Sequence, residues 1–243
     1  YIGLSKWTYK ENLKKKNSQP PQPGTLAFYA ALFNSVELNA THYSIPEAEK
    51  LNKWYNAVDR ADFHFCPKFY KGITHQGPVG LAKMGLTKDF MNRMREFKEK
   101  LGVSFIQLPH EQLPRQENIM TFLKLLPRDF SCAVSFTNEA WFTEPTRLTT
   151  FVGELHDINI GTIITDSPGR RDAVHMQLST ATAFIRFNCQ GDEALDIFRV
   201  GEWKKQIKSW FLQGLEKCYF FLHIHNKDAE EDFINFVQYE FKF

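Results

Sequence analysis

FNSVELNATHYSIP, residues 33–46, is the stretch that decides the fold, because it joins a buried strand to inward polar groups. Side chains alternate between the two faces of a strand, so Val36 and Leu38 share one apolar face. Glu37 and Asn39 lie on the opposite face. If the apolar face packs on a helix layer, the polar face points into a space that tolerates a carboxylate. In a parallel barrel that space is the mouth, although Glu37 on the surface of an edge strand is the alternative.

The residues after this strand predict a polar rim and then a helix. The strand is expected to end in Thr41, His42 and Tyr43, which are polar or amphipathic groups suited to the edge of a site. Residues 44–47 have the pattern of a capping box, and Pro46 would lie in the first turn. A strand, a polar rim and a capped helix make up a βα unit.

Composition narrows the classes of protein that fit. With 243 residues and 43% hydrophobic content, the chain can bury the core of one α/β barrel or of two small domains. A formal charge of +2 is too small for the strong positive potential over the whole surface that is typical of proteins that coat nucleic acid, so any anion site must be local. The four cysteines form no CxxC pair, which suits reduced thiols and a cytoplasmic location. No membrane-length apolar run or charged-then-apolar leader is visible, so no membrane partner is expected.

Short apolar runs alternate with helical patterns along the whole chain. Thr25 is expected to cap a helix that ends at Asn34, and further helices are expected to begin at Thr87 and Thr143. Eight units of roughly 30 residues match the number of units and the chain length that are typical of a (β/α)8 barrel. We therefore predict a single-domain TIM barrel over residues 1–243 with its site at the C-terminal mouth. Besides the organising strand, the expected strands are 1–5, 63–66, 103–108, 132–136, 161–165, 183–187 and 219–224.

Several motifs, in this order along nearly the whole chain, resemble the YecE-like family, domain of unknown function 72. They are Ile2–Trp7, Phe33–Asn39 with Tyr43 and Pro46, Lys68 with Ile73–His75, Gln107–Pro109, Asp166–Gly169 and Arg186. The resemblance implies a TIM barrel in a family without an established activity, loosely similar to barrel endonucleases and sugar isomerases.

The chain departs from the family's pattern at three strand ends. The fifth strand usually has an acidic residue, Phe and then Arg, whereas this chain has Ser135, Phe136 and Thr137. The seventh strand ends in residues 188–189, Asn-Cys, in place of His-Gly, and residues 225–226, His-Asn, replace an Asn pair. The mouth thus lacks a carboxylate and an arginine that the family pattern usually has.

If each polar face points inward, the mouth collects eight polar groups: Glu37, Asn39, Lys68, Gln107, Asp166, Arg186, His223 and His225. Glu37, Lys68 and Asp166 are the catalytic candidates, with either carboxylate as general base. Close charges perturb one another's pKa, which suits catalysis, but an ion network that closes the barrel top fits equally well. Glu37 and Lys68 are expected to face each other from neighbouring strands.

The predicted ligand-binding residues combine cations that suit phosphate with aromatic rings that suit bases or sugars. For the aromatic residues, packing within a lid is the alternative. Cofactors are not identified, although His75 or His225 with Glu37 and Asp166, or the pair His223 and His225, resembles a divalent metal set. The predicted ligand-binding residues are Trp7, Asn39, Tyr43, His75, Gln107, Trp141, Arg170, Arg186, His225 and Asn226.

Two functional hypotheses follow. In the first, the protein is an enzyme that acts on a small anionic ligand, phosphate-bearing or similar to nucleic acid, with Lys68 and the arginines holding the anion. In the second, the barrel has lost its chemistry and binds a ligand or single-stranded nucleic acid through its aromatic rim. The missing fifth-strand carboxylate favours the second hypothesis, and the sequence does not decide the oligomeric state.

Overall fold

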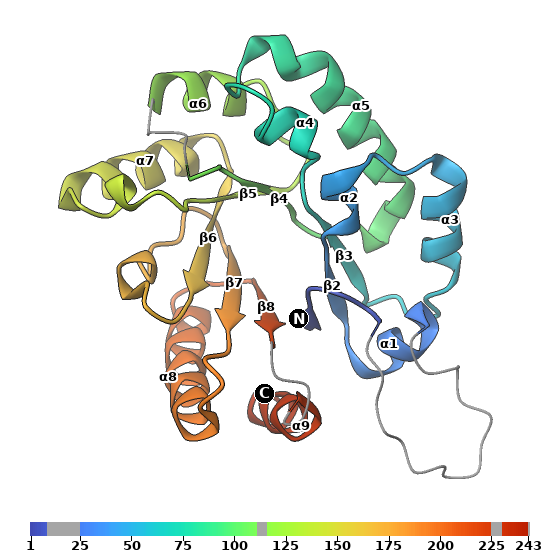
Figure 1. The fold of residues 1–243 in the computed structure, drawn as a ribbon, viewed down its shortest axis with the longest axis vertical. Coiled ribbons are helices and arrows are strands. Elements are labelled where there is room, and N and C mark those ends of the chain that lie inside the picture. The colour runs from blue at the N-terminus through green and yellow to red at the C-terminus, as the bar shows by residue number, and fades with distance from the viewer. Residues whose placement is uncertain (9–24, 111–115, 225–229, 243) are drawn as a thin grey trace.

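Eight parallel strands form one sheet with helices around its outer side (Figure 1). The computed structural model describes residues 1–8, 25–110, 116–224 and 230–242. The strand order is β3-β2-β1-β8-β7-β6-β5-β4, and every neighbouring pair in it is parallel. The strands are β1 Ile2–Leu4, β2 Ser35–Leu38, β3 His64–Pro67, β4 Ser104–Gln107, β5 Cys132–Ser135, β6 Gly161–Asp166, β7 Thr182–Asn188 and β8 Lys217–His223.

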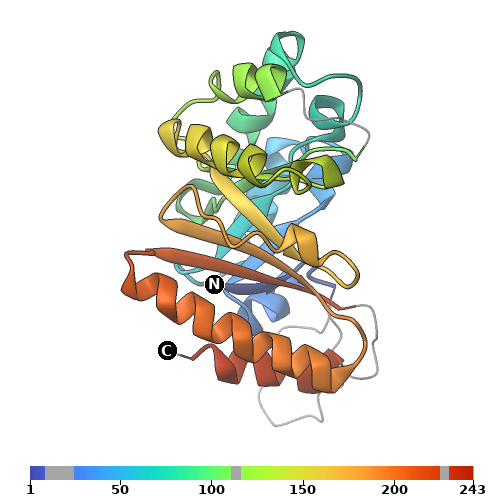
Figure 2. The same ribbon diagram turned by 90° about the vertical axis from the view of Figure 1, so that its left-hand side faces the viewer.

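Helices connect the strands as a (β/α)8 barrel requires. Figure 2 shows α8 and α9 lying side by side on the outer face of the sheet near its last two strands. Within the described ranges, every helix is too short or too polar to cross a membrane. The α-helices are α1 Leu26–Leu32, α2 Ala40–Tyr43, α3 Ala48–Asn56, α4 Lys71–Thr74, α5 Met84–Met94, α6 Gln116–Leu123, α7 Pro145–Asp157, α8 Glu193–Leu212 and α9 Glu230–Glu240.

The two end strands of the order, β3 and β4, nearly close the barrel. Two isolated parallel bridges join them, Phe65 with Leu101 and Lys68 with Phe105. The backbone N–H of Phe69 donates to the carbonyl of Phe105 at 2.9 Å, and Gly102 donates to Phe65 at 2.8 Å. The predicted TIM barrel is therefore confirmed.

The core has two parts because each strand buries both of its faces. The larger part lies between the sheet and the helices and includes Val36 and Leu38 of β2. The smaller part fills the inside of the barrel and is mostly aromatic. Its buried members are Cys66, Val103, Phe105, Ala133, Ile163, Phe184, Tyr219 and Phe221.

The region after β2 differs from the prediction. The strand ends at Leu38, and the residues expected to continue it form the short helix α2. The Thr41 hydroxyl donates to the carbonyl oxygens of Leu38 and Lys68, at 2.8 and 2.7 Å, and this ties α2 to two strand ends. The expected capping box does not form, because Glu47 is itself the N-cap of α3 and pairs with Arg93 at 2.9 Å.

The other predicted helix starts vary in accuracy. Thr25 caps α1 as expected, since its hydroxyl accepts from the Phe28 N–H at 3.2 Å. Thr87 lies inside α5, where its hydroxyl donates to the carbonyl of Lys83. Glu144 takes the N-cap position of α7 that was expected for Thr143.

Candidate functional site

The carboxyl ends of the strands carry a polar layer above the aromatic inside of the barrel. Because side chains alternate along a strand, residues two positions after those of the inner core lie on the same inner face, nearer the mouth. Lys68 lies two positions after Cys66, and Arg186 two positions after Phe184. The inner layer therefore consists of polar side chains from different strands, and we define it as Glu37, Lys68, Gln107, Ser135, Thr165, Arg186 and His223.

Glu37 and Arg186 form an ion pair across the inside of the barrel. The Arg186 guanidinium donates from Nε to one carboxylate oxygen at 2.9 Å and from Nη2 to the other at 3.0 Å. The Glu37 side chain is fully buried, and that of Arg186 is 14% exposed. A bidentate pair of this kind fixes the plane of the guanidinium as well as its charge. The guanidinium also lies over the Phe105 ring, 5.6 Å from its centre.

Two further groups complete the surroundings of the Glu37 carboxylate. His223 Nε2 lies 3.1 Å from it, and the Asn39 amide donates to it at 3.0 Å and to the Ser5 carbonyl at 3.2 Å. Burial alone would raise the pKa of Glu37, but Arg186 and His223 outweigh it and hold that pKa well below its ordinary value. Glu37 is thus ionised at neutral pH and orients the Arg186 guanidinium, while its role as a general base stays a prediction.

Lys68 lies in the same layer with a neutral partner. Its Nζ donates to the Gln107 side-chain oxygen at 2.8 Å. Its backbone is fixed on both sides, since its N–H donates to the Leu38 carbonyl at 3.1 Å and its own carbonyl accepts from Thr41. Burial lowers the pKa of Lys68 to about 8, with a further lowering by Arg186 and an opposing effect of Glu37.

Direct pairing of Glu37 with Lys68 is not what the structure shows. Both side chains lie on the inner face as predicted, but Glu37 pairs with Arg186 and contacts His223 among the described residues. The cause is the register of the sheet, which places Glu37 opposite Cys66 and carries Lys68 further toward the mouth. Arg186 of β7 and His223 of β8 instead reach Glu37 across the inside of the barrel.

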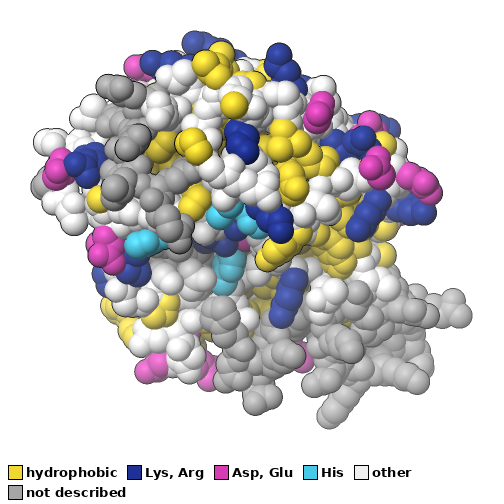
Figure 3. Space-filling view, turned by 45° about the horizontal axis from the view of Figure 1, so that its top comes forward, with side chains coloured by type: hydrophobic (Ala, Val, Ile, Leu, Met, Phe, Trp, Pro, Cys, Tyr) yellow, Lys and Arg dark blue, Asp and Glu magenta, His cyan; other side chains and the backbone are white. Residues whose placement is uncertain are grey.

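A rim of histidine, tyrosine and lysine lies next to Lys68. The rings of His42 and His75 are 4.8 Å apart and nearly perpendicular, and His42 Nδ1 lies 2.9 Å from the Phe69 carbonyl oxygen. Tyr43 is 68% exposed, and Lys71 Nζ lies 5.8 Å from the centre of its ring. Figure 3 shows histidine side chains beside Lys and Arg side chains near the centre of one face. In this rim Lys71 supplies positive charge, whereas burial lowers the pKa of His42.

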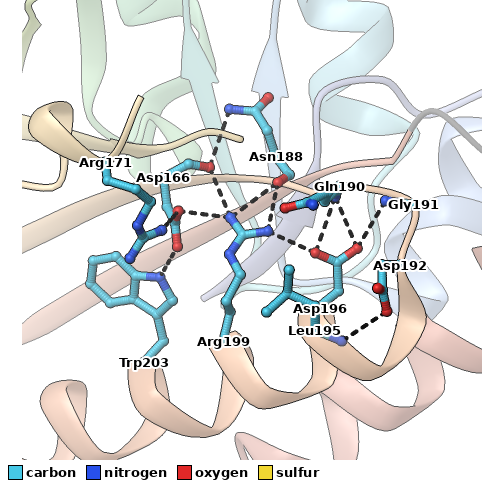
Figure 4. Close-up of polar contacts among 10 residues, drawn as sticks. All are labelled: Asp166, Arg171, Asn188, Gln190, Gly191, Asp192, Leu195, Asp196, Arg199 and Trp203. Carbon is cyan, nitrogen blue, oxygen red and sulfur yellow. Dashed lines mark hydrogen bonds and ion pairs between the residues drawn. The ribbon is translucent and has the colours of Figure 1, made fainter. Parts of the chain in front are cut away.

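Asp166 lies on the opposite side of the sheet from Glu37, so its predicted place in the mouth is wrong. It shares the outer face of β6 with Ile164, which belongs to the core between sheet and helices. There it pairs with Arg199 of α8 at 2.7 Å and accepts from the Trp203 indole N–H at 2.8 Å (Figure 4). Arg171, from the segment after β6, also donates to it.

Arg199 extends this network to the loop between β7 and α8 (Figure 4). It pairs with Asp196 at 2.7 Å and donates to the Asn188 carbonyl at 3.2 Å. Asp196 accepts the backbone N–H groups of Gln190 and Gly191, the latter at 3.2 Å. The network therefore fixes the loop that leaves the mouth at β7. Its sequence signal is the spacing of residues 196, 199 and 203, which puts two charges and an indole on one side of a helix.

The remaining predicted residues divide into buried, paired and undescribed ones. Trp7 packs edge-on against Trp54, with ring centres 5.0 Å apart. Trp141 is 1% exposed and lies in the core against Phe136, so its predicted rim position is wrong. Arg170 pairs with Asp172 and donates to the Thr137 carbonyl. Residues 225–226, His-Asn, lie outside the described residues.

The described residues contain no group of three or more His, Cys, Asp or Glu side chains that could hold a metal ion. The predicted set of Glu37, Asp166 and His75 is not assembled, because Asp166 lies behind the sheet. The alternatives that use His225 fall outside the described ranges.

The chain is a (β/α)8 barrel with a layer of polar side chains at its C-terminal mouth. The chain matches the family model "Protein of unknown function DUF72" over residues 1–239, and it belongs to this family. The UPF0759 protein YecE of Escherichia coli K12 is 28% identical over an alignment of 244 positions, and the match covers 92% of this chain and 85% of YecE. The UPF0759 protein YunF of Bacillus subtilis is 29% identical over 155 residues, 60% of this chain and 53% of YunF.

Solved structures of two DUF72 family proteins share the fold. The protein from Enterococcus faecalis V583 matches with a TM-score of 0.73, covering 98% of this chain and 95% of its own. The protein from Thermotoga maritima MSB8 matches with a TM-score of 0.72, covering 98% of each chain. Both are 18% identical in sequence, so they support the barrel and leave the ligand to be argued from this chain's own residues.

Proposed function

We propose that this protein is an enzyme that binds a small anionic, phosphate-bearing ligand at the mouth of its barrel. The observation that carries the proposal is the charge balance of the inner layer. In the described part of that layer Glu37 is the one carboxylate, it pairs with Arg186, and Lys68 is a second cation without an ion-pair partner. With Asp166 behind the sheet, the layer has an excess of positive charge in a half-buried place, where an anion is attracted strongly.

Each group in the layer has a distinct role in this proposal. Arg186 and Lys68 hold the anion, and Glu37 orients the guanidinium through its bidentate contact. His223 is the proton carrier, because a carboxylate at Nε2 favours the proton on that nitrogen and leaves the lone pair on Nδ1. Gln107 fixes the position of the Lys68 amine.

Thermal unfolding with a ligand panel tests the proposal, since a ligand that binds the native state raises the melting temperature. We expect inorganic phosphate and sugar phosphates to stabilise the parent protein and to stabilise Lys68→Met much less. Lys53→Met is the matched control, because Lys53 is 73% exposed on α3 and pairs only with the exposed Glu49 in the described structure. Equal responses of the two variants would refute the assignment of Lys68 to the anion site.

Binding of single-stranded nucleic acid is the second candidate, and the exposed Tyr43 ring beside Lys71 favours it. Bases stack on such rings, and the phosphates next to them are attracted by the amine. A short single-stranded DNA in the same panel separates the candidates. Tyr43→Ala should remove a DNA response and leave a sugar-phosphate response intact, whereas Lys68→Met should do the reverse.

A further inference from the structure

The position and the surroundings of Lys68 suit a lysine that reacts through its amine. It lies just beyond the carboxyl end of β3, where the active sites of TIM barrels lie, and it is half-buried, so a ligand in the mouth can reach it. Its Nζ donates to the neutral amide oxygen of Gln107 at 2.8 Å. In the described structure Glu37 is already bound by Arg186, and no carboxylate is ion-paired with Lys68. Among the described residues, Glu37 favours the charged amine only through its electrostatic effect, without an ion pair.

Burial and the neighbouring Arg186 together favour the neutral amine. Burial is the main cause that lowers the pKa of Lys68 to about 8, Arg186 adds to it, and Glu37 opposes it. His42 of α2 is a further titratable group that senses the lysine's charge. At pH 7.5 the free-amine fraction is then about 200-fold larger than for a lysine with the ordinary pKa of 10.5. A lysine that is desolvated beside another cation is a recognised type of amine nucleophile.

We infer that Lys68 forms a Schiff base with an aldehyde or ketone that carries a phosphate or carboxylate group. This inference rests on the proposed function, because the anionic group needs Arg186. That side chain contacts Glu37 through Nε and Nη2, so its Nη1 lies outside the contact and can bind the anion. The ligand would then present its carbonyl carbon to the amine in the same layer.

Formation of this imine is a condensation that releases water and needs no oxidant or reductant. The Nζ lone pair forms a bond to the carbonyl carbon, and the carbonyl π electrons move to its oxygen. The nitrogen gives one proton to that oxygen, and a second proton from solvent converts the hydroxyl into leaving water. The product is a protonated imine between Lys68 and the ligand, and hydrolysis reverses the step.

Reductive trapping tests this inference on the whole protein. Glyoxylate, pyruvate or glyceraldehyde 3-phosphate is added with sodium cyanoborohydride, whose hydride reduces the imine to a stable secondary amine. Peptide mass mapping then compares labelling of Lys68 with that of the exposed Lys53 in the same sample. We expect at least about tenfold more labelling at Lys68 at pH 7.5, because its free-amine fraction is larger. Labelling of Lys68 that is no greater than that of Lys53 overturns the inference.

Gln107→Glu tests the mechanism while the amine stays in place. A carboxylate at this position would pair with Nζ, raise the pKa of Lys68 and suppress labelling, whereas Gln107→Met should keep it. Labelling unchanged in Gln107→Glu would overturn the argument.

Inorganic phosphate, which has no carbonyl, separates the inference from the proposed function. Stabilisation by phosphate without an adduct overturns the Schiff base alone. An adduct at Lys68 without stabilisation by phosphate overturns the anion site and keeps the amine chemistry.

Discussion

Replacing Glu37 with glutamine should destabilise the barrel, because glutamine keeps the shape of the side chain and removes its charge. Glu37 is fully buried, and the Arg186 side chain is 14% exposed, so the guanidinium would remain largely buried without a counter-charge. Loss of one partner of a buried ion pair costs about 3–5 kcal/mol. The variant also weakens the contact with His223 at 3.1 Å. We therefore expect the free energy of unfolding of Glu37→Gln to fall by about 3–5 kcal/mol.

Urea denaturation measures this loss as a shift of the midpoint at constant slope. Adding Arg186→Met to Glu37→Gln should recover much of the stability, because neither charge is then left alone. Glu49→Gln is the matched control, since it breaks an exposed pair with Lys53 and should hardly move the midpoint. A free energy of unfolding of Glu37→Gln within about 0.5 kcal/mol of that of the parent protein would show that the ion pair does not stabilise the mouth.

The same ion pair predicts a direction for the effect of pH. The folded protein holds the pKa of Glu37 below the ordinary value of 4.5, since Arg186 and His223 outweigh the effect of burial. A carboxyl group with a depressed folded pKa contributes stability that is complete above its unfolded pKa and is lost as pH falls toward the folded pKa. The stability difference between the parent and Glu37→Gln should therefore be constant near neutral pH and shrink below about pH 4.5.

Three further predictions concern single side chains. The pKa of Lys68 is lowered from 10.5 to about 8 in the folded protein, so between these pH values the unfolded chain binds more protons than the folded one. The free energy of unfolding of the parent protein, relative to that of Lys68→Met, should therefore rise with pH over this range, as measured by urea denaturation. Asp166→Asn should cost about 1.5–3 kcal/mol by urea denaturation, because it weakens charged hydrogen bonds to the buried Arg199; no loss would show that Asp196 alone neutralises Arg199. Gly3→Ala should lower the melting temperature, since its Cβ would meet the Ser35 carbonyl oxygen, and a cost of about 1–3 kcal/mol is expected; an unchanged melting temperature would contradict this.

The strands were predictable from sequence because each one is a local pattern. All eight expected strands overlap observed ones, and the alternation in β2 correctly placed Val36 outside and Glu37 inside. The end of β2 was not predictable in the same way. Thr41 binds the carbonyl oxygens of Leu38 and Lys68, and the second of these belongs to a strand that comes later in the sequence.

The face of Asp166 was hidden for a different reason. A strand of a parallel barrel is buried on both sides, so its sequence is apolar throughout and shows no alternation. In β6 the residues Ile163 and Ile164 look alike in sequence, yet Ile163 belongs to the inside of the barrel and Ile164 to the outer core. Asp166 shares the face of Ile164 and therefore meets α8. The partner of Glu37 was likewise out of reach, since Arg186 lies 149 residues away.

Ser135 connects the chain's departure from the family pattern with the chemistry of Lys68. The resemblance to the YecE-like family implies an acidic residue at this point of the fifth strand, and the structure places Ser135 in register with Gln107, the partner of Lys68. A carboxylate there would lie one strand beyond Gln107 and would favour the charged form of the amine. Serine cannot do so, and the amine of Lys68 instead meets an amide while Arg186 lowers its pKa further. In our proposal, the absence of this carboxylate, which favoured the hypothesis of lost catalysis, is instead one reason why Lys68 can act as a nucleophile.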